Sequence, residues 1–353
     1  MAKAPEEFDI TTKRDKEMRK KKMMNKKHYI KSLVMLATML LVACGSGSDG
    51  IEDTPPTTSS EAPKEIQVTS NVYRRLEATR TTTYDNVASL QTEAQFTCTA
   101  YNAGTLTAYI PTTTSDWISE TSRWGFNNGD DHYYWPASGN LDFFGYMPAT
   151  RPSYIAADPT YTAEHNVTFT CSSLPVTNAG QGSSLKEFMF GMALDQNYGN
   201  AAAGVPLTFQ HPFARIKLQL AASHPNVTIN SITFKTIQNN GNFTYNHSAS
   251  TSTWVSSGDA TDFVLSLTGD AADFDNNPAS ERQIGDYYIM IPQNWTGEIE
   301  VNADCLYWGV KKNYPSLTTT VPTNWQPGYS YTYTFNISPD DLIVNISKFT
   351  EQW

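Results

Sequence analysis

Basic residues are scarce in this chain of 353 residues, and they become scarcer once the N-terminal segment is set aside. The sequence has 25 Lys and Arg against 35 Asp and Glu. Residues 1–43 contain 11 of the bases but only 5 of the acids, so residues 44–353 carry 14 bases and 30 acids, a net charge of −16. Binding to nucleic acid needs cationic residues against phosphate, so this balance argues against such a partner. It is typical of a soluble, self-repelling extracellular surface.

Cysteine is also rare. The four cysteines are Cys44, Cys98, Cys171 and Cys305. If Cys44 is modified, three remain, and an odd number in so long a chain excludes a disulfide framework. Buried free thiols in strands are the interpretation that we favour, and a bridge between Cys98 and Cys171 is the alternative.

Lys, Glu and Leu, the residues that usually fill helices, are sparse, whereas Thr, Ser, Tyr, Trp, Val and Asn are abundant. Strand formers therefore dominate, with turn formers between them, and the sequence shows no convincing helix, heptad or short-period repeat. This composition predicts an all-β protein. About 310 residues follow the N-terminal segment, which is enough for two domains of ordinary size.

Catalytic and metal-binding motifs are lacking as well. The chain has no G-x-S-x-G, H-E-x-x-H or P-loop sequence, and no pair of carboxylates stands out as a glycosidase dyad. Asp130, Asp131 and His132 lie in a polar turn without a metal-binding signature, and residues 270–277 lack the spacing of a calcium loop. We interpret His211, which precedes a proline, as a buried structural histidine. The sequence thus predicts no enzyme activity, no cofactor and no metal.

One apolar run is present, and it is short. Within residues 32–44 the apolar core is about a dozen residues long, where a membrane-spanning helix needs ~20, and a dense run of bases that begins at Arg19 precedes it. This order is that of a secretory signal. Its last four residues, Leu41-Val42-Ala43-Cys44, resemble a bacterial lipobox. The resemblance implies cleavage before Cys44, a palmitate-type lipid on its sulfur and a place at the outer membrane surface; an ordinary signal peptide is the alternative.

The remaining chain divides into a tether and two predicted domains. Residues 44–64 are rich in Gly, Ser, Pro and acids, which cannot bury a core, so they form a flexible tether behind the signal peptide and its N-terminal extension at residues 1–43. The predicted domains are residues 65–204 and 205–353. Each consists of short alternating segments at spacings typical of a β-sandwich.

The alternation of apolar and polar residues over residues 65–72 predicts the first strand there. The apolar residues that share one face are Ile66, Val68 and Val72. A polar loop follows that contains Arg75 and Arg80. Exposed loops are where proteolytic nicking concentrates, so this loop is a candidate cut site for an arginine-specific protease.

Two segments near the C-terminus alternate cleanly. Residues 329–337 place aromatic side chains on one face and Ser, Thr and Asn on the other, and residues 342–346 form a closing strand. The apolar residues of the closing strand are Leu342, Val344 and Ile346. Further upstream, the apolar face of residues 227–236 shifts once, which predicts a β-bulge.

The chain has eight tryptophans. Packing in the core is the default for aromatic residues on alternating strands. The tryptophans nearer turns or strand ends are Trp117, Trp124, Trp254 and Trp308. These residues allow the alternative of an exposed face that stacks against glycans.

Several short motifs occur in one order along the chain. They are Leu41-Val42-Ala43-Cys44, Thr79-Arg80-Thr81, Trp135-Pro136 before Leu141-Asp142-Phe143-Phe144-Gly145-Tyr146, Leu207-Thr208-Phe209-Gln210-His211-Pro212-Phe213-Ala214-Arg215-Ile216, Ile291-Pro292-Gln293 and Trp325-Gln326-Pro327-Gly328-Tyr329-Ser330-Tyr331. With these motifs the chain resembles the fimbrillin family, the lipoprotein pilins of type V pili, in its Mfa-like branch. The resemblance covers residues 44–353.

The resemblance implies two tandem β-sandwiches of Greek-key, transthyretin-like topology and a mode of assembly. A precursor lipidated at Cys44 is cut after an arginine that follows the first strand, for which Arg80 is the best match and Arg75 the second. Loss of strand 65–72 bares a groove, which a C-terminal strand of a neighbouring subunit fills; here residues 342–346 are the candidate. The implied partners are other pilin subunits, the outer membrane, and a glycan or protein on a host or bacterial surface.

The short C-terminal tail leaves an alternative. Only 16 residues follow the tyrosine-rich strand at 329–337. Pairing of these residues within their own domain would disfavour donor-strand polymerisation from this end. The alternative is a surface lipoprotein that does not polymerise and acts as an adhesin or glycan-binding module.

Overall fold

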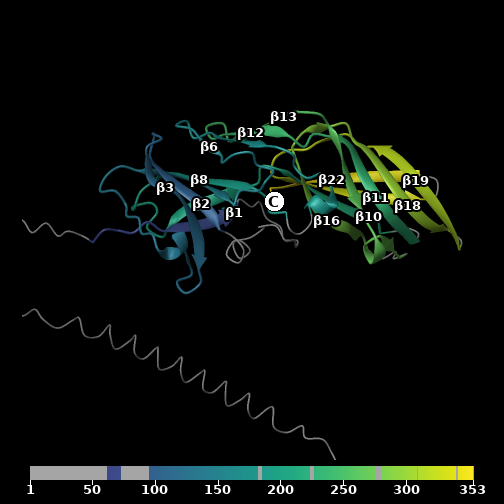
Figure 1. Cartoon of the computed structure of the whole chain (residues 1–353), viewed down its shortest axis with the longest axis horizontal. Helices are drawn as coiled ribbons and strands as arrows, with labels where there is room; N and C mark the ends of the chain where they lie inside the picture. Colours follow the sequence, from purple (N-terminus) through teal and green to yellow (C-terminus); the bar gives the residue numbers. More distant parts are fainter. Residues whose placement is uncertain are drawn as a thin grey trace, which may run out of the picture. The chain divides into compact units, whose positions relative to one another are not determined.

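Figure 1 shows the computed structural model of the chain. The structure describes residues 62–72, 95–181, 185–222, 226–275, 280–307, 309–338 and 341–352, all of which belong to one compact unit, Ala62–Trp353. Strands make up nearly all of its regular structure, so the predicted all-β class is confirmed. The three short helices of this part are η1 (Asn127–Gly129), α3 (Asn178–Gln181) and η2 (Gly269–Ala271). None of its helices is long and apolar enough to cross a membrane.

The first strands form a closed barrel. In spatial order its strands are β1 (Val68–Val72), β4 (Arg123–Phe126), β3 (Ala108–Ile118), β2 (Phe96–Asn102), β5 (Leu141–Met147), β8 (Met189–Gln196) and β9 (Val205–Gln210). β5 is buried along its whole length. Its alternate residues serve two cores, because Leu141 and Phe143 pack inside the barrel while Phe144 and Tyr146 pack in an aromatic cluster outside it.

A second sheet joins strands from the two halves of the chain. In order its strands are β13 (Thr251–Ser256), β12 (Gly241–Asn246), β7 (Val167–Cys171) and β6 (Thr160–Tyr161). The pairing of β7 with β12 places Phe169 opposite Phe243, with ring centroids 4.7 Å apart. Three strand pairs therefore cross the predicted boundary between residues 204 and 205, namely β7 with β12, β9 with β1 and β9 with β8.

The C-terminal strands form a sandwich. One sheet has the order β16 (Arg282–Met290), β10 (Ala214–Leu220), β21 (Tyr329–Ser338) and β22 (Asp341–Gln352). The other has the order β14 (Thr261–Ser266), β11 (Asn226–Ile237), β18 (Glu298–Tyr307) and β19 (Val310–Thr320), with β15 (Asp273–Phe274) beside β11 and a small pair, β17 (Asn294–Trp295) and β20 (Thr323–Asn324), apart. A single apolar core takes side chains from both sheets.

The alternation in these strands agrees with the sequence pattern. The inward residues Tyr331, Tyr333, Phe335 and Ile337 of β21 are fully buried. The pairing of β11 with β18 shifts register between Ile229 and Ser231, which confirms the predicted bulge.

Candidate functional site

The segment that leads into β1 is held by main-chain hydrogen bonds to two other parts of the barrel. The Ile66 N–H donates to the carbonyl oxygen of Tyr133 (2.7 Å), and the N–H of Trp135 donates to the carbonyl oxygen of Lys64 (2.9 Å). On the other side, the Val205 N–H donates to the carbonyl oxygen of Gln67 (2.7 Å). The segment is therefore bonded along both of its edges before β1 begins.

β1 itself is bonded unequally on its two edges. It pairs in parallel with β9 along all of its length, from Val68 opposite Val205 to Val72 opposite Phe209. With β4 it makes a single antiparallel pair, Val68 opposite Trp124. Closure of the barrel at the seam between β1 and β4 thus depends on one residue pair, whereas the ladder to β9 is continuous.

The side chains that point from this segment into the barrel are buried. Ile66 and Val68 are each 2% exposed and belong to the apolar core of the barrel. Burial of two aliphatic side chains stabilises the strand in its slot by about 3–6 kcal/mol. The next inward position is Ser70, also buried. Of Val72, the third residue of the predicted face, the structure describes only the main chain.

The seam between β1 and β4 opens into a pocket of about 790 Å³, which we call the seam pocket. Its walls are Gln67–Ser70 of the first strand, Trp117 and Thr121–Trp124 of the β3–β4 hairpin, and Ala203. Trp117 and Trp124 meet edge to face there, with centroids 5.6 Å apart. The sequence analysis singled out both tryptophans but missed Ser70 and Arg123, because no local pattern shows that the first strand and this hairpin form one wall.

The predicted closing strand lies in β22, at the edge of its own sheet. β22 pairs antiparallel with β21, with Leu342 opposite Ile337 and Ile346 opposite Tyr333. Val344 is 8% exposed and packs in the C-terminal core, while its neighbour Ile343 is 49% exposed. The side chains of Leu342 and Ile346 lie outside the described part. In this chain the closing strand therefore completes its own domain.

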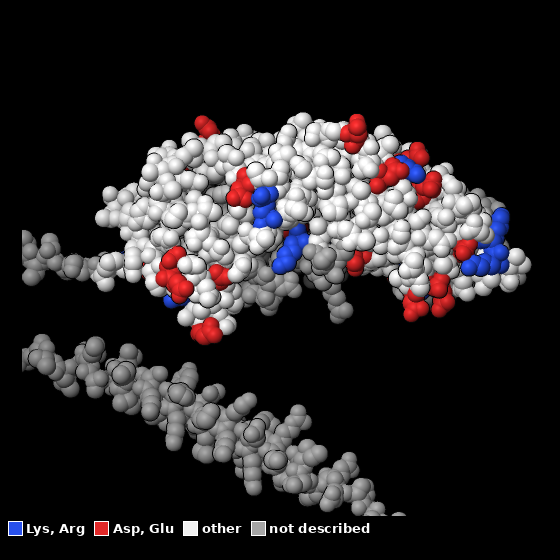
Figure 2. Space-filling view, viewed as in Figure 1, with Lys and Arg blue, Asp and Glu red and all other residues white. Residues whose placement is uncertain are grey.

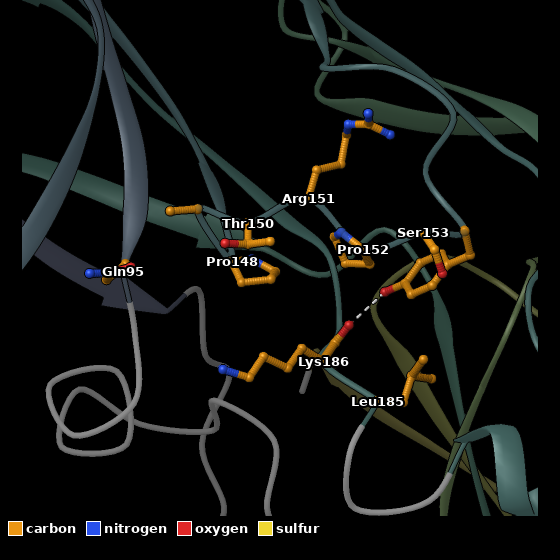
Figure 3. Close-up of a pocket in the computed structure, with 10 residues that line it drawn as sticks. Gln95, Pro148, Thr150, Arg151, Pro152, Ser153, Leu185 and Lys186 are labelled. Atoms are coloured by element: carbon orange, nitrogen blue, oxygen red, sulfur yellow. Dashed lines mark hydrogen bonds between the residues drawn. The ribbon is translucent and has the colours of Figure 1, made fainter.

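A second hollow, of about 460 Å³, lies beside Gln95, the first residue described after residues 73–94. Figure 3 shows Pro148, Pro152 and Lys186 around it. The Tyr154 hydroxyl donates to the carbonyl oxygen of Lys186 (2.8 Å) and accepts from the Phe188 N–H (2.9 Å), which joins the loop after β5 to the segment before β8.

Three predicted site residues lie outside the described part of the chain. They are Cys44, the predicted lipidation site, and Arg75 and Arg80, the predicted processing sites. Their roles stay predictions. Trp308 lies outside the described part as well. Trp254 packs against the aromatic cluster outside the barrel, and its Nε1–H donates to the carbonyl oxygen of Pro212 (2.7 Å).

The polar clusters of the sequence analysis have ordinary structural partners. His132 pairs with Glu65, and Asp273 accepts a hydrogen bond from the Thr228 hydroxyl (2.7 Å). Within the described ranges, no group of three or more His, Cys, Asp or Glu side chains could hold a metal ion.

His211 is buried, as predicted, and contacts a partner that the sequence pattern did not reveal. Its Nδ1 lies 2.9 Å from Oε2 of Glu187, and both side chains are almost fully buried. Glu187 immediately precedes the apolar run that forms β8. An acidic residue directly before a buried strand was the sequence feature that could have indicated a buried partner for His211.

The three cysteines of the described part are free and buried, which agrees with the favoured interpretation. Burial raises the pKa of the Cys98 and Cys171 thiols to about 12. Both thiols therefore stay protonated in the folded chain at neutral pH.

Comparison with solved structures finds similar folds. The structure of a candidate cell adhesion protein from Bacteroides ovatus matches with a TM-score of 0.52 at 15% identity, over 82% of this chain and 98% of that chain. The tip fimbrial protein Mfa3 from Porphyromonas gingivalis matches with a TM-score of 0.41 at 11% identity, over 81% and 99%. The fimbrial anchor protein Mfa2 of the same organism matches with a TM-score of 0.34 at 8% identity, over 81% and 97%.

Two comparisons of the sequence gave different results, one with curated proteins and one with models of protein families. No curated protein matches the chain. The profile of the fimbrillin-like family, however, matches residues 67–353, from the start of β1 to the last residue. On this match, the chain belongs to the fimbrillin-like family.

Proposed function

We propose that this protein is a structural subunit of cell-surface fimbriae that contributes to adhesion. It is exported, lipidated at Cys44 and held at the outer membrane, and a protease cuts it after Arg80 or Arg75. The cut releases the subunit from its lipid and frees β1 to leave the barrel. The β22 strand of a neighbouring subunit then fills the slot.

The observation that carries the proposal is how β1 sits in the barrel. It is the first strand of the described chain, it and the segment before it bury Val68 and Ile66, and it is bonded along its length to β9 alone. A terminal strand held by one ladder and a few apolar side chains can be replaced by another alternating strand, because main-chain bonds and alternate pockets define the slot. An empty slot would expose apolar surface and unpaired main chain, which drives its refilling.

The position of β22 is compatible with the donor role but adds a step. β22 is the outer strand of its sheet, so its pairing with β21 and the packing of Val344 in the C-terminal core must break before it can enter another barrel. If it stays with β21, the chain remains a single surface lipoprotein, which is the alternative function.

The test starts from the unprocessed chain and an arginine-specific protease. We expect a cut after Arg80 or Arg75, loss of the segment that contains β1, and a ladder of oligomers on SDS gels. Replacement of both arginines, together with the neighbouring Arg74, by alanine should abolish the cut in this loop and the ladder together. A processed chain that stays monomeric would contradict the stalk-subunit proposal.

A matched pair of variants tests the donor strand. Val344→Asp places a carboxylate at a buried position of β22, whereas Ile343→Asp changes the exposed neighbour. We expect both variants to be cut and only Ile343→Asp to form the ladder. Circular dichroism of the uncut variants controls for loss of folding, and an equal ladder from both variants would exclude β22 as the donor.

A further inference from the structure

β13 is an edge strand that no other segment of the described chain covers. It pairs with β12 from Gly241 opposite Ser256 to Asn246 opposite Thr251, without a shift in register. On its other side it has neither a neighbouring strand nor an isolated bridge within the described ranges. Its outer edge therefore presents main-chain donors and acceptors that a further strand can bond.

The hydrogen bonds of the hairpin identify the residues that face the outer edge. The Ser257 N–H donates to the carbonyl oxygen of Asn240 (3.0 Å), so the main-chain groups of odd-numbered residues in this strand point toward β12. Because the direction alternates along an antiparallel ladder, the N–H and C=O groups of Ser252, Trp254 and Ser256 point away from β12. These groups recur at the regular spacing that a partner strand requires.

The other sheet edges in the described part of the chain are each protected. β6, β15, β17 and β20 have two residues each. The Gln181 side chain bonds both the N–H and the C=O of Ile289 on β16 (2.8 and 2.9 Å), and the Val264 N–H on β14 donates to the carbonyl oxygen of Val176 (2.9 Å). Charged residues or proline occur on the two remaining edges, namely Lys311, Lys312 and Pro315 on β19 and Asp341, Lys348 and Glu351 on β22. Short length, cover, charge and proline all oppose association at an edge, and β13 has none of them.

The hairpin that contains β13 is uncharged, although the chain as a whole is acidic. Residues 236–258 include no Asp, Glu, Lys or Arg. Figure 1 places β13 at the upper border of the view, where the surface in Figure 2 is mostly white. Copies of an acidic chain repel one another, so an uncharged edge is a place where two copies can come together with little repulsion.

We propose that β13 pairs with β13 of a second copy of this chain, antiparallel and about a two-fold axis at Trp254. In this register Trp254 lies opposite its counterpart, and Ser252 lies opposite Ser256 of the second copy. All the outward N–H and C=O groups of the strand are then bonded. The two sheets, each of the order β13-β12-β7-β6, join into one continuous sheet.

The outer side chains of β13 fit the same register. Val255 is 66% exposed, and Thr251 and Thr253 are exposed as well. The register places Val255 opposite Thr253 of the second copy, and β-branched side chains pack well in such cross-strand pairs. The contact also removes the Val255 side chain from water. It involves neither β1 nor β22, so it is separate from the strand exchange proposed above.

Sedimentation equilibrium of the uncut chain tests the dimer. The pairing involves six residues of each copy, so it buries less than the ~1,200 Å² at which standard interfaces begin, and we expect a dissociation constant on the order of 100 µM. Raising the salt concentration from about 0.05 M to about 0.5 M should tighten the dimer, because salt screens the repulsion between two acidic copies. A dimer held by ion pairs would weaken instead, which would contradict the proposal.

Val255→Glu and Val310→Glu are a matched pair of variants. Both valines are exposed on edge strands, at 66% and 67%, so neither change disturbs a core. Val255→Glu places the two new carboxylates diagonally across the two-fold axis and should weaken the dimer about tenfold. Val310→Glu adds the same charge to β19 and should leave dimerisation unchanged. Thermal unfolding of both variants controls for loss of folding.

Mixed variants test the register. Glu at position 255 lies directly opposite position 253 of the second copy, so a mixture of Val255→Glu with Thr253→Lys should form a heterodimer more tightly than either variant associates with itself. A mixture of Val255→Glu with Thr251→Lys should recover less. A larger recovery with Thr251→Lys would overturn the proposed register.

Hydrogen exchange resolved to single residues tests which main-chain groups pair. In dilute solution the N–H groups of Ser252, Trp254 and Ser256 should exchange fast, and at high protein concentration they should become protected. The N–H groups of Thr253 and Val255, which face β12, should be protected at both concentrations.

The outcomes do not depend on processing, because every measurement uses the uncut chain. A chain that stays monomeric up to about 1 mM, equal weakening by Val255→Glu and Val310→Glu, or a dimer that forms without protection of the three outward N–H groups would overturn the proposal. Protection of these groups by an added uncharged peptide, in a chain that stays monomeric, would assign the edge to a different protein and would also overturn it.

Discussion

At the scale of single residues, Gly297 is the glycine at which an added side chain would make the shortest contact with neighbouring atoms. It lies between β17 and β18 with a φ of +91°, and a Cβ added there would come within 2.2 Å of the carbonyl carbon of Val321. The Val321 N–H donates a hydrogen bond to the Gly297 carbonyl oxygen (2.7 Å), which holds the two main-chain segments close together. The turn therefore requires glycine for space as well as for conformation.

We expect Gly297→Ala to lower the free energy of unfolding by about 2–4 kcal/mol, from the strained φ together with a clash against main-chain atoms that cannot move aside. Gly309→Ala is the matched control, because Gly309 also has a positive φ (78°) but open space around it. It should cost about 1–2 kcal/mol. Urea unfolding of both variants measures the difference, and equal losses would show that the close approach has no cost.

Buried polar residues in this protein differ in how well they are satisfied. The carboxylate of Asp142 on β5 accepts hydrogen bonds from the N–H groups of Gly104 (3.1 Å) and Asp195 (2.8 Å), and one of its oxygens lies 3.1 Å from Nε2 of His165. Ser70, by contrast, has an Oγ without a partner. A satisfied buried carboxylate fixes structure, whereas a buried hydroxyl without a partner costs about 1–3 kcal/mol.

At the scale of elements, the two edges of β1 are bonded unequally, which is compatible with the replacement of this strand that we propose. Its ladder to β9 is continuous, and its contact with β4 is one residue pair. The apolar side chains Ile66 and Val68 add a few kcal/mol of burial. The ladder to β9 and the buried side chains thus hold the strand in place, whereas only one residue pair with β4 has to break at the seam.

We expect Val68→Asp to destabilise the unprocessed chain by about 3–5 kcal/mol, because it buries a carboxylate without a partner. Thr69→Asp changes the exposed neighbour and should cost about 1 kcal/mol, for the loss of the bond from the Thr69 hydroxyl to the Val205 carbonyl oxygen. Thermal unfolding compares the two. If the protease removes β1, the processed forms of both variants should be equally stable; a difference that persists would place Val68 outside the removed segment.

At the scale of the whole molecule, acidic side chains dominate the charged surface. On the face that Figure 2 shows, red acidic groups occur along much of the described part, while blue basic groups gather in a few places. This agrees with the excess of 30 acids over 14 bases in residues 44–353. Copies of a chain with such a surface repel one another in solution, so the assembly that we propose would have to come from specific strand pairing rather than from general attraction.

The buried thiols and phenols predict a loss of stability in alkali. Burial raises the pKa of Cys98 and Cys171 from 9.0 to about 12, and that of Tyr288 and Tyr331 from 10.0 to about 12. The unfolded chain loses these protons from about pH 9 upward while the folded chain keeps them, so their contribution is complete below pH 9 and is lost progressively up to about pH 12.

We therefore expect Tm to be insensitive to these groups at pH 7–8 and to fall steeply above pH 9, with each buried thiol contributing about 1.4 kcal/mol per pH unit. A variant with both Cys98 and Cys171 replaced by alanine should show a shallower decline, because two of the titrating groups are gone. Calorimetry across this pH range measures both slopes. Equal slopes would show that the thiols do not contribute, and a chain with a Cys98–Cys171 disulfide would behave in that way.

Three features were predictable from the sequence: the all-β class, the alternation of β21 and the bulge in β11. Burial of every second residue in a strand is a local property, so the order of consecutive residues shows it. The family was predictable for a similar reason, since its motifs are short and keep their order along the chain. The candidate site was predictable only in part. Ile66 and Val68 identified the first strand, and Trp117 and Trp124 identified the aromatic wall.

Only the tertiary structure placed these pieces together. The parallel pairing of β1 with β9, the sheet shared by β7 and β12, and the seam pocket join residues that are far apart in sequence. Alternation defines which face of a strand is buried but not which strand lies beside it, because main-chain bonding groups are the same at every position. By itself the sequence determined which segments form strands, and the fold decided their neighbours: it placed the first strand and the β3–β4 hairpin around one pocket and seated β22 beside β21.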